Sequence, residues 1–263
     1  MLNLNKIFSI FILILSLMFS ACGGSDGSDE NNNGDPSSGI PQGKSGIVGV
    51  WIGYDWNGYT NSLRYIVFYE DGAFRFTLPE KGFVGFDKAK DKIDNHGKNI
   101  WGTYTFSGKT GTWKYDAEGA KSPDSLTLES DGGLNLGTTL YKKFYRCAIV
   151  DNYKLNSSYT PYSDPTDLTT FYSSGDRPVI SFKSDGTFVD EGLYKFDDLN
   201  LFFPYFTKKG SGTYELKDYT LILNYSDSTK VQASFTFKYG TNIKDASDSI
   251  IFNNRSFYQM PWM

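Results

Sequence analysis

The feature that most constrains the fold is a pair of similar Asp-Gly turns, each flanked by alternating apolar residues. They lie in Ile66–Phe76 and Ile180–Phe188, and in both segments Ile and Phe precede the Asp by five and three residues. A second Phe follows the Gly by two residues. Asp-Gly accepts the positive φ of a tight turn, and a period of two directs one face of each strand inward. Each segment therefore predicts a β-hairpin.

Further matches extend each hairpin into a longer repeat. An insertion follows each hairpin, and then Gly-Thr-Tyr, at residues 102–104 and 212–214. The later matches that we predict are an alternating strand, 126–128 with 221–223, and a closing strand, 139–144 with 249–252. A unit of this length that occurs twice predicts two similar modules, joined near Asp151.

Aromatic side chains make up 17% of the chain, with 19 Tyr and 21 Phe, and they alternate with polar residues in short runs. Such rings fill the pleated face of a strand, so the pattern is typical of β-structure. Short strands separated by turn signals indicate a small barrel or a sandwich. We therefore predict an all-β protein with two antiparallel β-barrel or sandwich modules in tandem, at residues 47–150 and 151–263.

The opening of the first unit carries a family resemblance. Gly-Val-Trp at 49–51 resembles the Gly-x-Trp that begins the first strand of lipocalins and other calycins, and the hairpin and Gly-x-Tyr order resembles bacterial lipocalin-like lipoproteins. In that family the Trp closes one barrel end, often against an Arg from a late strand. The resemblance therefore implies barrel closure by Gly49, Trp51 and Arg146. The second unit has Ser-Ser-Tyr at the corresponding place, 157–159.

The chain begins like an exported lipoprotein. Lys6 precedes an apolar run over residues 7–19, and Ser-Ala-Cys follows at 20–22. The run is shorter than the roughly 20 residues of a spanning helix, and the small residues behind it fit cleavage. An ordinary anchor helix is the alternative. The segment resembles the bacterial lipoprotein signal, in which the Cys is acylated, and this implies a signal peptide over residues 1–21 and a lipid on Cys22.

Residues 22–46 are rich in Gly, Ser, Asn and acidic side chains and contain almost no apolar ones. Such a composition cannot offset the entropy of ordering, so we predict a disordered tether. Asp26, Asp29 and Glu30 lie just behind the Cys and are similar to the surface-export signal of Bacteroidota lipoproteins. We therefore expect a cell-envelope protein held at the outer membrane by its lipid, with the cell surface favoured over the periplasmic face.

Charge and cysteine content narrow the partners and the chemistry. The formal net charge is −4, so no basic field attracts phosphate backbones, and we expect no nucleic-acid partner. Once Cys22 is acylated, Cys147 has no partner for an intrachain disulfide. Cys147 lies in an apolar run, which favours a small buried side chain over a reactive thiol.

Motifs for the common enzyme chemistries are absent from the sequence. The only histidine, His96, lies in a polar segment, and no nucleophile elbow, zinc motif, phosphate loop or dinucleotide fingerprint is present. The aspartates of the two hairpin turns lack the further oxygen ligands that calcium needs. We therefore predict no metal and no cofactor. Two carboxylate pairs, Glu70–Asp71 and Asp190–Glu191, leave a glycoside-active enzyme as the third hypothesis.

Aromatic loops are better candidates for binding. The insertions at residues 79–86 and 199–206 are apolar, although loops normally face water. A third aromatic group, near the end of the first strand, has rings that suit stacking on sugars. The candidate ligand-binding residues are Tyr54, Trp56, Tyr59, Phe83, Phe86, Phe202, Phe203, Tyr205 and Phe206. The alternatives are that both loops plug their own barrels and that the third group packs a strand face.

Two functional hypotheses of different classes are favoured over the glycoside-active enzyme. The first is a non-enzymatic binding protein that captures a small apolar ligand or a glycan at barrel mouths covered by residues 79–86 and 199–206. The second is an envelope interaction protein, for example an inhibitor of a secreted enzyme. The second hypothesis predicts a flat exposed aromatic patch instead of a cavity.

Overall fold

A computed structural model describes residues 46–56, 61–91, 99–116, 123–137, 143–163, 176–196, 204–237 and 248–260. The predicted signal peptide, Cys22 and the tether up to residue 45 lie outside these ranges, as do Tyr59, His96, Phe202 and Phe203. The side chains of residues 54–56, 61 and 62 are also outside the description. The described ranges contain no helix that is long and apolar enough to cross a membrane.

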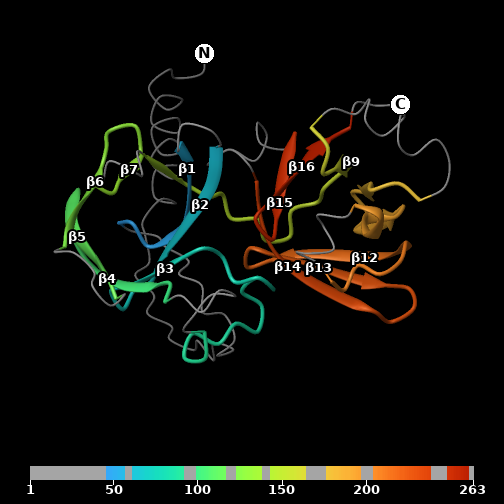
Figure 1. The fold of residues 1–263 in the computed structure, drawn as a ribbon, viewed down its shortest axis with the longest axis horizontal. Helices are drawn as coiled ribbons and strands as arrows, with labels where there is room; N and C mark the ends of the chain where they lie inside the picture. The colour runs from blue at the N-terminus through green and yellow to red at the C-terminus, as the bar shows by residue number, and fades with distance from the viewer. Residues whose placement is uncertain are drawn as a thin grey trace, which may run out of the picture. The chain divides into compact units, whose positions relative to one another are not determined.

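The first module is a closed barrel in which each strand pairs antiparallel with the next along the chain (Figure 1). Its strands are β1 (Gly49–Trp56), β2 (Asn61–Phe68), β3 (Ala73–Phe76), β4 (Trp101–Ser107), β5 (Thr110–Tyr115), β6 (Asp124–Leu128), β7 (Leu134–Asn135) and β8 (Phe144–Arg146). β8 returns to β1, where Arg146 pairs with Trp51 and closes the barrel.

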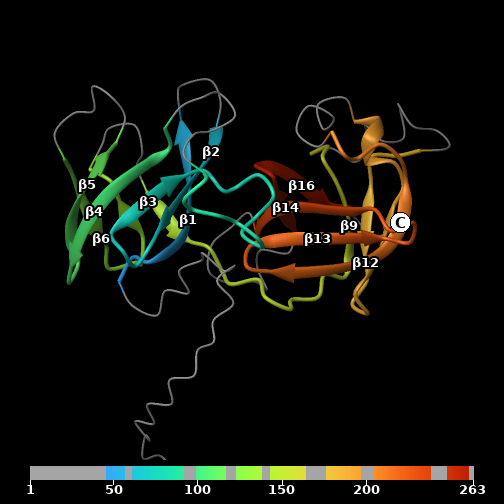
Figure 2. The same ribbon diagram turned by 90° about the horizontal axis from the view of Figure 1, so that it is seen from below.

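The second module is also a closed barrel of eight strands (Figure 2). They are β9 (Ser157–Thr160), β10 (Ile180–Phe182), β11 (Thr187–Asp190), β12 (Gly210–Lys217), β13 (Thr220–Tyr225), β14 (Lys230–Phe237), β15 (Ser249–Phe252) and β16 (Arg255–Gln259). A short 3-10 helix, η1 (Leu193–Lys195), follows β11. Tyr159 pairs with Gln259 where Trp51 pairs with Arg146 in the first barrel, so closure here needs no Gly-x-Trp.

The all-β class and the two antiparallel modules are confirmed, and both modules are barrels. The predicted matches after Gly-Thr-Tyr are wrong by one strand. Residues 221–223 lie in β13, which is equivalent to β5 by its place in the barrel, whereas residues 126–128 lie in β6. Similarly, residues 249–252 form β15, the equivalent of β7 and not of the closing strand. Short apolar alternation is common to every barrel strand and therefore does not identify which strand a segment forms.

The repeated Gly-Thr-Tyr has one packing role in both barrels. Its glycine lies between two aromatic residues on neighbouring strands. The equivalent trios are Phe74–Gly102–Tyr115 and Phe188–Gly212–Tyr225. A Cβ on Gly102 would lie 2.2 Å from the Phe74 ring, and a Cβ on Gly212 would lie 1.9 Å from the Asn224 carbonyl oxygen. The glycine thus makes room inside each barrel for the rings and backbone beside it.

Residues 49–53 of β1 and 65–68 of β2 are buried on both faces of the sheet. Trp51 and Phe68 belong to the cluster that fills the first barrel, while Val50 and Tyr65 belong to a second cluster. This second cluster also contains Tyr219 and Ile251 from the second barrel. Strands that are covered on both faces have near-continuous apolar runs, as β1 and β2 do. The second cluster is therefore a shared interface, and both barrels fall within one compact unit of the chain.

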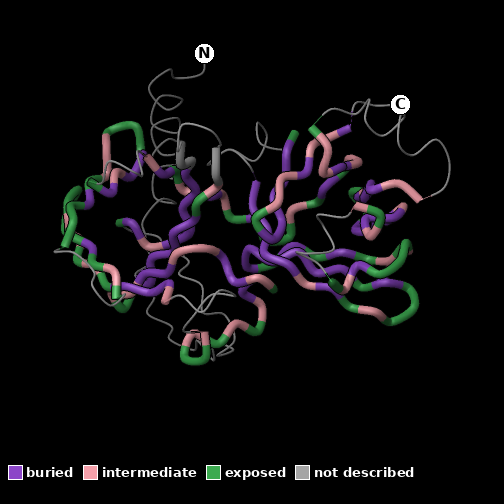
Figure 3. The backbone as a smooth tube through the Cα atoms, in the orientation of Figure 1, coloured by how far each residue is buried: buried purple, intermediate pink, exposed green. Residues whose placement is uncertain are grey.

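Two hydrogen bonds join polar groups across this interface. The Tyr65 hydroxyl and Thr236 Oγ1 lie 2.7 Å apart, with both residues buried. The Tyr219 hydroxyl donates to the Cys147 carbonyl oxygen at 3.3 Å. Burial continues along β13 and β14, including outward-facing positions such as Thr236 (Figure 3). Buried polar groups need such partners, so these bonds fix the orientation of one barrel against the other.

Residues 79–86 form a strap across the interface, here called the inter-barrel strap. Phe83 and the residue after it donate their backbone N–H groups to Thr220 Oγ1 at 2.8 and 3.1 Å. The Ser234 N–H donates to the Glu80 carbonyl oxygen at 3.1 Å. Beyond the strap, Arg75 forms an ion pair of 2.7 Å with Asp91, five residues after Phe86. The strap therefore joins the wall of the first barrel to β13 and β14 of the second.

Candidate functional site

The interior of the second barrel is filled by its own side chains. Every strand contributes to one apolar cluster. Its buried strand members are Tyr159, Ile180, Phe182, Phe188, Tyr214, Leu216, Leu221, Leu223, Tyr225, Val231, Ala233, Phe235, Phe237, Ile250, Phe252 and Phe257. Two of these rings, Phe252 and Phe257, stack at 3.7 Å between centroids.

The first barrel is packed in the same way. Its cluster consists of Ile47, Trp51, Ile66, Phe68, Phe74, Trp113, Leu126, Leu134, Leu136 and Phe144. Phe74 and Trp113 meet edge to face at 5.5 Å between ring centroids. The Trp113 indole N–H donates to the Leu136 carbonyl oxygen at 2.9 Å, which satisfies its buried polar atom. A core of this kind stabilises a barrel without a disulfide.

The residues predicted to close the first barrel come together at one end. The Arg146 guanidinium lies 4.7 Å from the centre of the Trp51 ring, and the Trp51 indole N–H donates to the Ile47 carbonyl oxygen at 2.7 Å. Gly49 has a φ of 132°, and a Cβ there would lie 2.8 Å from an Arg146 nitrogen. Glycine is therefore required beside the arginine, and the three residues form one structural unit.

The aromatic residues of the first insertion lie at the inter-barrel interface. Phe83 is fully buried and belongs to the shared cluster, with its ring 5.6 Å from Phe86 and 6.3 Å from Tyr219. Phe83 is not a member of the cluster that fills the first barrel. Phe83 is thus buried between the outer wall of the first barrel and the second barrel, an arrangement that neither hypothesis for the strap included.

The described part of the second insertion lies against its own barrel. Phe206 is buried in the second barrel cluster, and Tyr205 packs on that cluster with its hydroxyl 3.3 Å from the Gln232 carbonyl oxygen. Phe202, Phe203 and Tyr59 lie outside the described residues, and nothing is described of the Tyr54 and Trp56 side chains. Their role in ligand binding stays a prediction.

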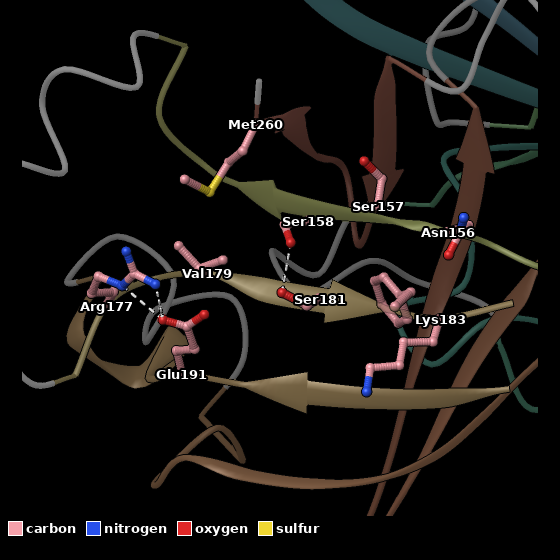
Figure 4. Close-up of a pocket in the computed structure, with 10 residues that line it drawn as sticks. Asn156, Ser157, Ser158, Arg177, Val179, Ser181, Lys183, Glu191 and Met260 are labelled. Carbon is pink, nitrogen blue, oxygen red and sulfur yellow. Dashed lines mark hydrogen bonds and ion pairs between the residues drawn. The ribbon is translucent and has the colours of Figure 1, made fainter. Parts of the chain in front are cut away.

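A pocket of about 310 Å³ lies on the outer wall of the second barrel, over β9 and β10 (Figure 4). Ser181 faces outward because its neighbours Ile180 and Phe182 point into the barrel core. The pocket is lined by Asn156, Ser157, Ser158, Arg177, Val179, Ser181, Phe182, Lys183, Glu191 and Met260. Its volume is at the lower end of the roughly 300–1,000 Å³ of small-molecule sites.

Hydroxyl groups form the floor of this pocket. Ser158 pairs with Ser181 across β9 and β10, and their Oγ atoms lie 2.7 Å apart. Two hydroxyls that share one hydrogen bond keep one donor and several acceptor lone pairs for a ligand. Met260 and Val179 form an apolar contact at the side of the floor. The floor therefore combines hydrogen-bonding groups with a small apolar surface.

Charged groups lie at both ends of the pocket. The Arg177 Nε atom donates to Glu191 Oε2 at 2.7 Å, and a second guanidinium nitrogen binds the same oxygen, so this pair is neutral overall. Lys183 lies two residues beyond Ser181 on the same outward face and is exposed. The lining thus carries two cations and one anion, a net charge of +1. Among the described residues, the Lys183 ammonium takes part in no hydrogen bond or ion pair, and only the backbone of this residue is bonded.

Comparisons with family models, curated proteins and solved structures find no match to this chain. The function is therefore inferred from the geometry and chemistry of the pocket. Sequence reasoning missed this site because Ser158, Ser181 and Glu191 come from three separate segments that only the barrel brings together. The alternation of apolar Ile180 and Phe182 with polar Ser181 and Lys183 is the one local signal, since it indicates a polar outer face at β10.

The carboxyl groups of Asp190 and Glu191 do not face a common site. Asp190 points into the barrel, where it accepts the Tyr225 hydroxyl at 2.9 Å and the Gly192 and Leu193 N–H groups at 2.9 and 2.8 Å. Burial raises the pKa of the Asp190 carboxyl, and these hydrogen bonds oppose that shift. Glu191 lies on the outer wall with Arg177 (Figure 4). The two carboxyl groups therefore lie on opposite faces, and Asp190 holds η1 and the upper end of the barrel in place.

The remaining reactive groups are accounted for by packing or by turns. Asp71 accepts the Ala73 N–H at 3.1 Å, and Asp185 accepts the Thr187 N–H at 2.9 Å, as expected for tight turns. Cys147 is buried, and desolvation raises the pKa of its thiol. No group of three or more His, Cys, Asp or Glu side chains with the geometry of a metal site occurs in the described ranges.

Exposed apolar residues are few on the described surface. Those with large side chains are Tyr145, Ile149 and Val189, and a single one of them is aromatic. Val189 pairs with Ser181 and so lies beside the pocket floor. Scattered exposed apolar residues are normal in soluble domains. Across the described residues, this pattern does not provide the flat aromatic patch that the interaction hypothesis predicts.

Proposed function

We propose that this protein is a non-enzymatic binding protein of the cell envelope, and that it binds a glycan in the outer-wall pocket of its second barrel. The observation that carries the proposal is the pocket itself, with its paired serine hydroxyls between two charged ends. The proposed site differs from the barrel mouths that the sequence favoured. Packed cores on the described strands favour the outer wall over the interior.

The chemistry of the lining favours a glycan over an apolar ligand. A sugar hydroxyl both donates and accepts hydrogen bonds, and the pocket offers both functions. Ser158, Ser181 and the Asn156 amide supply donors and acceptors. Both nitrogens of Arg177 bind Glu191 Oε2, so the other carboxylate oxygen of Glu191 can accept a hydrogen bond from a sugar hydroxyl. Met260, which keeps 9% of its surface exposed, supplies a small apolar surface that suits the C–H face of a sugar ring. An apolar ligand would leave these polar groups unpaired, which costs binding free energy.

Replacing both floor serines by Val is expected to weaken glycan binding about tenfold or more, because each lost hydrogen bond contributes roughly 0.5–1.5 kcal/mol. The variant Ser158→Val with Ser181→Val keeps the β-strand preference of both positions and leaves the barrel core unchanged. Isothermal titration with a saccharide identified by a glycan array measures the dissociation constant.

The first barrel provides a matched control. Thr105 and Thr112 face each other on β4 and β5 with their Oγ1 atoms 3.0 Å apart, and both are exposed. Replacing both by Val removes a hydroxyl pair of similar geometry outside the pocket. Binding should stay unchanged in this control. Equal loss in both variants, or unchanged binding after loss of the serines, would place the glycan elsewhere.

The proposal includes a lipid anchor on Cys22 and a place at the outer membrane, with the cell surface favoured. The support is the short apolar run with small residues before Cys22 and the acidic tether behind it. A tethered pocket would be held close to the membrane while the tether gives it reach. Surface exposure would give the pocket access to external glycans.

Replacing Cys22 by Ala is expected to release the folded protein from the membrane fraction, because the lipid would be its only attachment. Fractionation and metabolic labelling with a radioactive fatty acid measure the two effects. The Cys147→Ala variant is the control and should keep both the label and the membrane association, since Cys147 is buried. A Cys22→Ala protein that stays in the membrane fraction would contradict the anchor.

A further inference from the structure

The pocket is asymmetric in charge from one end to the other. At one end of the pocket the Arg177 guanidinium binds Glu191 through two nitrogens, so neither charge is free to attract a ligand strongly. At the opposite end, here called the Lys183 end, the Lys183 side chain is exposed. Ser181 and Lys183 are separated by two residues of extended chain, which is about 7 Å along the strand. The Cα atoms of the two residues are thus about 7 Å apart, and both residues line the same pocket.

A second lysine lies near the turn that begins at Lys183. The Lys154 side chain reaches the turn at residues 183–187, since its Nζ atom lies 3.0 Å from the position of a Cβ on Gly186. Its ammonium also lies 5.5 Å from the centre of the Tyr214 ring. Asp185 is the acidic group on this turn, but its Oδ1 atom already accepts the N–H and the hydroxyl of Thr187. Two lysines and one turn-bound aspartate leave a net charge of +1 at the Lys183 end.

We infer that the pocket selects an acidic saccharide, whose carboxylate or sulfate binds Lys183 while its neutral hydroxyls bind Ser158 and Ser181. This inference rests on the proposed glycan-binding function and adds the charge class of the glycan. The ammonium of a lysine donates charge-assisted hydrogen bonds to an anion, and these are about twice as strong as neutral ones. The Arg177–Glu191 pair at the other end is neutral overall and attracts an anion less than Lys183 does, so one orientation is favoured.

The test begins with the full-length protein in detergent on an array of neutral, uronate-containing and sulfated saccharides. Saccharides with an anionic group are expected to bind, and neutral ones to bind at least about tenfold more weakly. A uronate ligand is then compared with its methyl ester, which keeps the sugar and removes the charge. The acid should bind better than the ester, and added salt should reduce the difference because it screens the exposed lysine.

Lys183→Met is expected to remove the preference for the acid while leaving the weaker binding of the ester. Lys230→Met is the control, since Lys230 is an exposed lysine of the same barrel outside the pocket lining. Equal binding of acid and ester, or a preference that survives Lys183→Met, would overturn the acidic class and leave the glycan function standing. An array without binding of either class would overturn both.

Discussion

Replacing Phe83 by Ala is expected to lower the free energy of unfolding by about 3–5 kcal/mol, the usual cost of removing a buried phenyl ring. Phe83 is fully buried between the barrels, against Tyr219 and Phe86. Its loss leaves a cavity in the shared cluster and removes apolar contacts that the two barrels make with each other. The backbone bonds from the strap to Thr220 remain available, so the change acts mainly on packing.

Chemical denaturation followed by tryptophan fluorescence measures this change, since Trp51, Trp101 and Trp113 all belong to the first barrel. The wild-type chain should unfold in one transition because the shared cluster couples the barrels. Phe86→Ala is the control: it changes the same residue type in the same strap, but Phe86 is only partly buried. A loss of stability no larger than that of Phe86→Ala would mean that the interface contributes little.

Replacing Gly212 by Val is expected to destabilise the protein by about 3 kcal/mol, the upper part of the usual range for overpacking. A Cβ at Gly212 would lie 1.9 Å from the Asn224 carbonyl oxygen, and backbone atoms cannot rotate away as a side chain does. β12 and β13 must then separate at the point where Phe188 and Tyr225 pack. Their rings meet edge to face at 4.9 Å, so the distortion would reach the barrel core.

Thr213→Val is the matched control for this substitution. It places the same side chain one residue later, on the outer face, where Thr213 is exposed. Thermal unfolding monitored by circular dichroism should show a lower midpoint for Gly212→Val and little change for Thr213→Val. Comparable midpoints in the two variants would contradict the packing role that we assign to the repeated glycine.

Local patterns predicted the hairpins well because their causes are local. The Asp-Gly turns at residues 71–72 and 185–186 need only a positive φ and an alternating flank, and both form hairpins. The pairing of Trp51 with Arg146 was implied by a family resemblance, since the two residues are far apart in sequence. The later strands were matched one position out because alternation is the same in each of them.

Long-range packing set the outcome for the aromatic insertions and the pocket. The apolar composition of residues 79–86 indicated that the segment is buried but not which surface covers it. In the structure the strap bonds to β13 of the second barrel. The near-continuous apolar runs of β1 and β2 were the available signal of a second covered face. The pocket gave no comparable signal, because isolated serines and charged residues are ordinary on any outer strand face.

By itself the sequence determined the all-β class, the duplication and the turns, since periodicity and Asp-Gly chemistry act over a few residues. It is also the whole basis for the proposed anchor at Cys22. Only the tertiary structure decided that each module closes into a barrel, that a strap joins the two, and that Ser158, Ser181 and Lys183 share one pocket. The physical reason is that strand closure and the burial of an outer face depend on contacts between segments that lie far apart in the chain, which no local pattern encodes.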